Sequence, residues 1–139
     1  RIEVRGKIDG YERGGSGLSH ERSIAIVVES ADRLVLTVTD IVRSENEMKL
    51  DCIATFMLHP SWKLAETLPG VSEIRLQSDR ASAHFAFEGN CDDPFVAAES
   101  YSPEYGARIP CSAIRTSFSG PGNAILITNL TCTPMSHTD

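Results

Sequence analysis

The chain has 139 residues, enough for one domain with a hydrophobic core and too few for two. Hydrophobic residues make up 41% and charged residues 23%, as in ordinary globular proteins, and no apolar run approaches the ~20 residues of a membrane span. The net charge of −6, without a visible basic patch, argues against a nucleic-acid partner. The sequence begins at Arg1 inside a strand-like pattern, so we expect a fragment or a processed product.

Apolar and polar residues alternate along most of the chain, which predicts strands with one buried and one more exposed face. The alternating runs lie, in chain order, at residues 2–8, 24–28, 34–38, 48–58, 74–76, 83–87, 114–118 and 124–130. Turn-forming residues separate them, as at Gly14–Gly17, Pro69-Gly70 and Gly120-Pro121-Gly122. This punctuation predicts an all-β fold, one antiparallel β-sandwich of about 8–11 strands over residues 1–133 with a flexible tail at 134–139.

The inward-facing positions of these runs define the expected core. Its members are Leu34, Leu36, Val38, Leu50, Cys52, Phe56, Phe85, Phe87, Leu126 and Leu130. The one helical signal is Asp93-Pro94, which predicts a single turn through Ala98 because proline suits the first helical position. The segment Tyr101–Pro110, with two prolines and Gly106, predicts a rigid turn between two strands, with Pro110 delaying entry into the second.

Candidate chemistry lies near the N-terminus, at Tyr11 and at His20-Glu21-Arg22. Tyrosine can pass a proton to a leaving oxygen, histidine can accept one, and arginine can pair with a carboxylate in a fork. The alternative is structural, with the Tyr11 ring sealing the sandwich edge and Arg22 paired with an acidic neighbour. Tyr105 is a further candidate for a groove if another domain packs at its turn.

Other polar and aromatic residues carry weaker signals. Trp62 could be a sugar-stacking platform or a half-buried cover for the end of the sandwich. The histidines 20, 59, 84 and 137 lie on separate elements, so we expect no metal site and no cofactor. The four cysteines form no C-x-x-C pair, and free buried thiols and disulfides both remain open.

Several short segments together resemble a known family. They are Asp9-Gly10-Tyr11, His20-x-Arg22, the run Leu34–Asp40 ending in aspartate, Phe56–Pro60 ending in His-Pro, and Tyr-Ser-Pro-x-Tyr-Gly at Tyr101–Gly106. Their order over residues 9–110 is similar to that in the C-terminal β-sandwich of the heparinase II/III-like polysaccharide lyases. The position before Asp9 is Ile8, where relatives often have a histidine.

The resemblance implies a parent enzyme in which an α/α toroid precedes the sheet region and cleaves uronate-containing polysaccharides by β-elimination. It implies that this chain supports an upstream toroid, contains no catalytic residue and is inactive alone. Tyr11, His20, Arg22 and Tyr105 would border the substrate, an acidic polysaccharide. The protein would be bacterial in type and periplasmic or secreted. The alternative function is a non-catalytic carbohydrate-binding or structural module.

Two strands have apolar residues on both faces. Ile53 with Met57, and Ile125 with Ile127, stand where an exposed sheet face should be polar. We expect either that the toroid docks there or that other parts of the chain cover them. An uncovered patch would also favour a homodimer.

Overall fold

The computed structural model describes residues 1–8, 17–67 and 72–135, which form ten β-strands. In chain order they are β1 (Ile2–Ile8), β2 (Leu18–Ser30), β3 (Arg33–Ser44), β4 (Lys49–Met57), β5 (Lys63–Thr67), β6 (Glu73–Gln77), β7 (Ala81–Gly89), β8 (Phe95–Tyr101), β9 (Ile109–Pro121) and β10 (Asn123–Pro134). The described residues contain no helix, and hence none that could cross a membrane.

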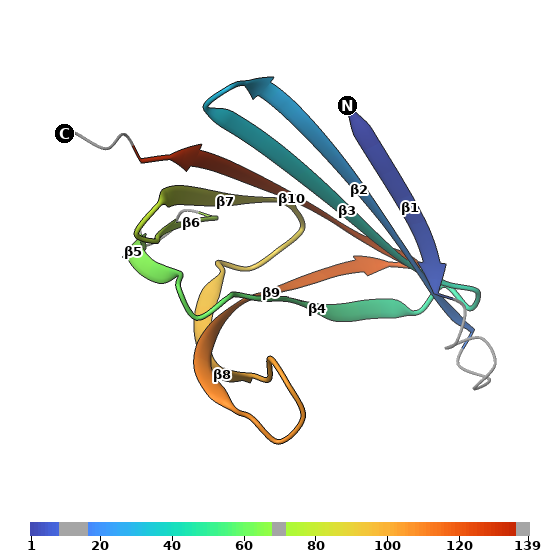
Figure 1. Ribbon diagram of the computed structural model, residues 1–139. Coiled ribbons are helices and arrows are strands. Elements are labelled where there is room, and N and C mark those ends of the chain that lie inside the picture. The colour runs from blue at the N-terminus through green and yellow to red at the C-terminus, as the bar shows by residue number, and fades with distance from the viewer. Residues whose placement is uncertain (9–16, 68–71, 136–139) are drawn as a thin grey trace.

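The strands form two antiparallel sheets packed face to face (Figure 1). The larger has seven strands in the order β1-β2-β3-β10-β7-β6-β5, and the smaller has three in the order β4-β9-β8. The predicted antiparallel sandwich is therefore confirmed, with a strand number inside the expected range. β10 continues to Pro134, one residue into the segment predicted as a tail.

The core lies where the two sheets overlap. The larger sheet contributes Ile74, Phe85 and Leu126, and the smaller contributes Ile114 and Phe118, all buried. The ring of Phe56 on β4 packs between the sheets, 5.9 Å from Phe85 and 6.1 Å from Phe87. Five of the predicted core residues are buried (Val38, Leu50, Phe85, Phe87, Leu126) and five are half-buried (Leu34, Leu36, Cys52, Phe56, Leu130). Leu34, Leu36 and Leu130 are half-buried because the three-stranded sheet does not cover all of the seven-stranded sheet, whereas Cys52 and Phe56 lie on β4, an edge strand of the smaller sheet.

The helical turn predicted from Asp93-Pro94 is wrong, because β8 begins at Phe95 and pairs with β9. The preceding segment is already attached to β9. The amide of Asp92 donates to the carbonyl of Ser117 over 2.8 Å, and the Thr116 hydroxyl donates to the carbonyl of Asp92 over 2.8 Å. Sheet pairing therefore overrides the local helical preference.

The predicted turn between Tyr101 and Pro110 connects β8 to β9, and Gly106 adopts φ 80° there. Because β9 begins at Ile109, Pro110 lies inside the strand rather than before it, opposite Ser100. Another glycine lies at the corner where the chain passes from β9 in the smaller sheet to β10 in the larger sheet. A Cβ at Gly120 would lie 1.9 Å from the carbonyl oxygen of Asn123, so only glycine fits that close approach.

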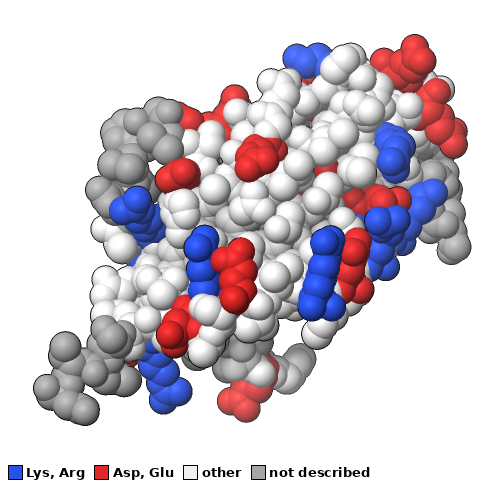
Figure 2. Space-filling model, turned by 90° about the horizontal axis from the view of Figure 1, so that it is seen from above, with Lys and Arg blue, Asp and Glu red and all other residues white. Residues whose placement is uncertain are grey.

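The outer face of the larger sheet is largely polar, with apolar residues at Val35, Ile41, Ile125 and Ile127. Glu73 and His84 pair across β6 and β7 at 3.0 Å, and the Thr37 hydroxyl donates to the side chain of Asn129 on β10. Figure 2 looks toward this side of the molecule and shows charged side chains in clusters, with uncharged surface between them. Three of the four apolar residues noted on second faces, Ile53, Met57 and Ile125, are exposed. All four cysteines are free thiols and half-buried.

Candidate functional site

The register of β2 against β3 places three ionisable side chains on one face of the larger sheet. Arg22 lies directly opposite Asp40, and His20 lies two residues before Arg22 on the same side of β2. This is the face that packs toward the smaller sheet, because Leu126, the partner of Asp40 on β10, is fully buried. The three residues form what we call the His–Arg–Asp cluster.

Asp40 is the centre of this cluster. Its Oδ1 accepts hydrogen bonds from Nε of Arg22 at 2.7 Å and from Nε2 of His20 at 2.8 Å, and its Oδ2 accepts one from Nη2 of Arg22 at 3.0 Å. Because an ionised carboxylate only accepts hydrogen bonds, Nε2 of His20 carries a proton. Asp40 is only 1% exposed, so its charge needs these partners to remain inside the protein.

Arg22 also joins the two sheets. Its guanidinium carbon lies 5.6 Å from the centre of the Phe56 ring on β4, within the range of a cation–π interaction. The side chain of Arg22 is 38% exposed and that of His20 is 22% exposed. Both therefore reach the surface while the carboxylate that holds them stays buried.

The exposed side of the cluster faces a groove between β4 and the inner face of β2 and β3. One hollow of about 360 Å³ is lined by His20, Arg22 and Asp40 from the larger sheet and by Asp51 and Cys52 from β4. A second hollow of about 500 Å³ continues beyond Arg22, and its lining is mostly apolar, including Ile24, Val38, Phe56 and Trp62. Since Arg22 lines both hollows, we call them together the β4 groove.

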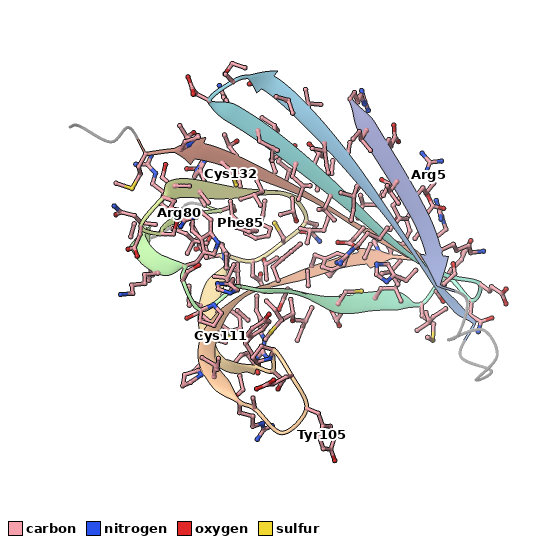
Figure 3. All side chains as sticks on the ribbon, viewed as in Figure 1. Arg5, Arg80, Phe85, Tyr105, Cys111 and Cys132 are labelled. Atoms are coloured by element: carbon pink, nitrogen blue, oxygen red, sulfur yellow. The ribbon has the colours of Figure 1, made fainter. Side chains whose placement is uncertain are left out.

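The structure brings two of the four predicted site residues together. His20 and Arg22 share Asp40, as described. Tyr105 is fully exposed and projects from the tip of the loop after β8, away from β2 (Figure 3). Tyr11 lies outside the described residues.

Asp40 is the member of the cluster that the sequence reasoning did not assign. A signal was present, because Asp40 continues the alternating run Leu34, Leu36 and Val38 and so occupies a core-facing position. A charged residue at such a position is rarely buried without a partner. The expectation that Arg22 pairs with an acidic neighbour is confirmed, with Asp40 as that neighbour.

Trp62 takes the structural role rather than that of an open platform. It is half-buried and packs against the core cluster. The neighbouring His59 accepts a hydrogen bond from the backbone amide of Ser61 at Nδ1 over 3.2 Å and contacts the Tyr101 ring edge-on at 5.5 Å. These contacts build a compact turn at the end of the sandwich.

The described residues offer neither a cluster of metal ligands nor an activated cysteine nucleophile. Within residues 1–8, 17–67 and 72–135, no three His, Cys, Asp or Glu side chains converge as metal ligands. Burial raises the pKa of the Cys52 thiol, with a further rise from Asp51. Burial likewise raises the pKa of Cys132, and that of Cys91 together with Asp92 and Asp93. These thiols are therefore less ionised, and less nucleophilic, than exposed cysteines.

Comparison with known proteins agrees with this fold. A family model described as "Heparinase II/III-like, C-terminal" matches residues 2–130. A solved structure titled "Heparinase III-BT4657 gene product" superposes with a TM-score of 0.68 at 11% identity, covering 96% of this chain and 19% of that one. A form of it with methylated lysines gives a TM-score of 0.67 at 14% identity, with the same coverage. Comparison with curated proteins gives no match.

The fold and its register define an antiparallel β-sandwich domain with a buried carboxylate cluster facing a groove. The family model matches residues 2–130, which is nearly the whole chain. The chain belongs to the heparinase II/III-like family and corresponds to its C-terminal domain. It spans about a fifth of the length of the solved structures that it matches.

Proposed function

We propose that this chain is the C-terminal β-sandwich of a polysaccharide lyase that cleaves uronate-containing polysaccharides by β-elimination. In this proposal an upstream α/α toroid provides the catalytic residues, and the sandwich supports it. The observation that carries the proposal is the family match over residues 2–130. The chain covers 19% of the solved heparinase III. This small share supports the proposal that other domains of a longer protein carry out catalysis.

The His–Arg–Asp cluster suggests how the sandwich contributes. Two nitrogens of Arg22 are occupied by Asp40, so the fork that could hold a uronate carboxylate is already engaged inside the protein. Arg22 then acts as a positioning residue. His20, oriented through Nε2 and partly exposed in the groove, is the member better placed to contact a ligand. Tyr11 and Tyr105 remain proposed contacts on the strength of the resemblance alone.

The remaining partners follow from the same proposal. An acidic polysaccharide carries charge of the same sign as the net charge of −6, so local arginines would have to offset that repulsion. Such polysaccharides lie outside the cytoplasm, which suggests a periplasmic or secreted enzyme. Two outer faces are candidates for the contact with the toroid: that of the smaller sheet, with exposed Ile53 and Met57, and that of the larger sheet, with exposed Ile125.

An absorbance assay for the unsaturated uronate product tests the proposal. The longer protein encoded around this sequence should release the product from at least one of heparan sulfate, chondroitin sulfate, hyaluronan or alginate. The 139-residue chain alone should release none. In the longer protein, His20→Ala should raise KM more than it lowers kcat. Turnover by the 139-residue chain, abolished by His20→Ala, would refute the assignment of catalysis to the toroid.

A further inference from the structure

The inner face of the larger sheet is apolar well beyond the area that the smaller sheet covers. One row of side chains crosses the sheet from Phe87 through Thr128 and Val38 to Ile24 and Val4. Val38 is 4% exposed, Ile24 is half-buried and Val4 is 61% exposed. Burial is thus lost toward β1 while the side chains stay apolar.

The same gradient appears in the neighbouring rows. One row ends at Ile26 and Ile2, and Ile2 is 64% exposed. Another pairs Leu34 with Val28, which is 67% exposed. On the opposite face of β1 stand Glu3, Arg5 and Lys7. The alternation on β1 therefore marks the Ile2 and Val4 side as one suited to burial, although no described residue covers it.

The smaller sheet ends where this bare face begins. β4 pairs with β9 on one side and is an edge strand on the other. Its free edge lines the β4 groove, opposite β2 and β3. Charged residues, which commonly protect edges, occur on β4 only at Lys49 and Asp51, and no proline interrupts the strand. An open edge and a bare apolar face thus meet along one line.

We propose that this corner receives a β-hairpin from the remainder of a longer protein that contains this domain. One strand of the hairpin adds to the part of β4 that follows Ala54 and lies beneath Ile24 and Ile26 of β2, so the hollow beside His20 stays open. The other strand lies beneath β1. Sheets pack about 10 Å apart and strands about 4.8 Å apart, so two added strands match the two uncovered strands. The incoming strands carry alternating apolar residues that face Ile24, Ile26 and Val4.

The source of the hairpin is argued from chain length and charge. In the solved structures that share this fold, about four fifths of the chain lies outside the matched region, and the matching family region is described as C-terminal. A second copy is disfavoured, because it would bring together two molecules of net charge −6. A helix would cover the apolar face but leave the β4 edge without hydrogen bonds.

Hydrogen–deuterium exchange followed by mass spectrometry distinguishes these occupants. About half of the amides of β4 point away from β9. In the 139-residue chain these amides should exchange quickly, and in the longer protein at least about tenfold more slowly. β8, the other edge of the same sheet, should exchange equally in both and serves as the control. Unchanged exchange at β4 would overturn the proposal, even if the apolar face proved to be covered.

Cysteine labelling tests coverage of the face with a matched pair on one strand. Val4→Cys should react with iodoacetamide at least about tenfold more slowly in the longer protein than in the 139-residue chain. Arg5→Cys, its neighbour on the opposite face, should react equally in both. Peptide mapping separates these sites from the four native cysteines. Equal rates at position 4 would overturn the proposal. Slow labelling of Val4→Cys already in the 139-residue chain, with a dimer by light scattering, would assign the face to a second copy.

The inference shares with the proposed function only the premise of a longer protein. A longer protein that protects β4 and position 4 but releases no unsaturated product would retain the inference and remove the lyase function. An active enzyme with an unprotected β4 would do the opposite.

Discussion

Arg22 should be worth more to stability than its partial exposure suggests, because it neutralises a carboxylate that is 1% exposed. Arg22→Met removes both hydrogen bonds of the fork and leaves Asp40 with His20 alone. Breaking a buried ion pair by removing one partner costs about 3–5 kcal/mol. Since Arg22 itself is 38% exposed, we expect the lower end, about 3 kcal/mol.

The double variant Arg22→Met, Asp40→Leu provides the control. It removes the stranded charge and fills the space with apolar atoms, so it should lie within about 1 kcal/mol of the parent. Urea unfolding followed through the single tryptophan, Trp62, measures both. If the single variant lost less than about 1 kcal/mol, or if the double variant were as unstable as the two single variants summed, the buried-charge reasoning would be refuted.

Other expectations follow from packing and from the thiols. Phe56→Ala should cost about 3 kcal/mol in urea unfolding, the lower end for a core phenylalanine because the ring is half-buried, and a loss below about 1 kcal/mol would contradict its contacts with Phe85 and Phe87. Gly120→Ala should cost about 2–4 kcal/mol because its Cβ would meet the carbonyl of Asn123, whereas Gly6→Ala, with open space around it, should be neutral or slightly stabilising. Burial raises the pKa of Cys52, Cys91 and Cys132, so these thiols should be alkylated more slowly at pH 8 than a free thiol and faster as the pH rises. Rapid labelling of these cysteines at neutral pH would contradict this expectation.

The sequence was sufficient to predict which faces of the strands are buried, because side-chain alternation is a local property. Val38, Leu50 and Phe85 were predicted in this way and are buried. Strand order was not predictable, because β10 pairs with β3 and β7, which are distant in the chain. The helical turn at Asp93-Pro94 failed for a related reason, since its competitor was pairing with β9.

The candidate site shows the same division. The alternating run was predicted to begin at Ile24, whereas β2 begins at Leu18, and this longer strand is what puts His20 and Arg22 on one face. Their shared partner required the register between β2 and β3, which decides that Asp40 and not another acid faces Arg22. The run that seemed to end at Asp40 continues as strand to Ser44, so the aspartate is an interior residue of the sheet. Its burial, rather than its position at a strand end, explains its role.

The position of β10 has a consequence for the order in which the domain folds. β10 is the last strand, yet it lies in the middle of the larger sheet, between β1-β2-β3 and β7-β6-β5 (Figure 1). Among the described strands it alone joins these two halves. During synthesis from the N-terminus, each half can form hairpins but neither can reach the other until Asn123–Pro134 has left the ribosome. The domain therefore closes late and all at once, and shortening its C-terminus by one strand would divide the sheet in two rather than trim its edge.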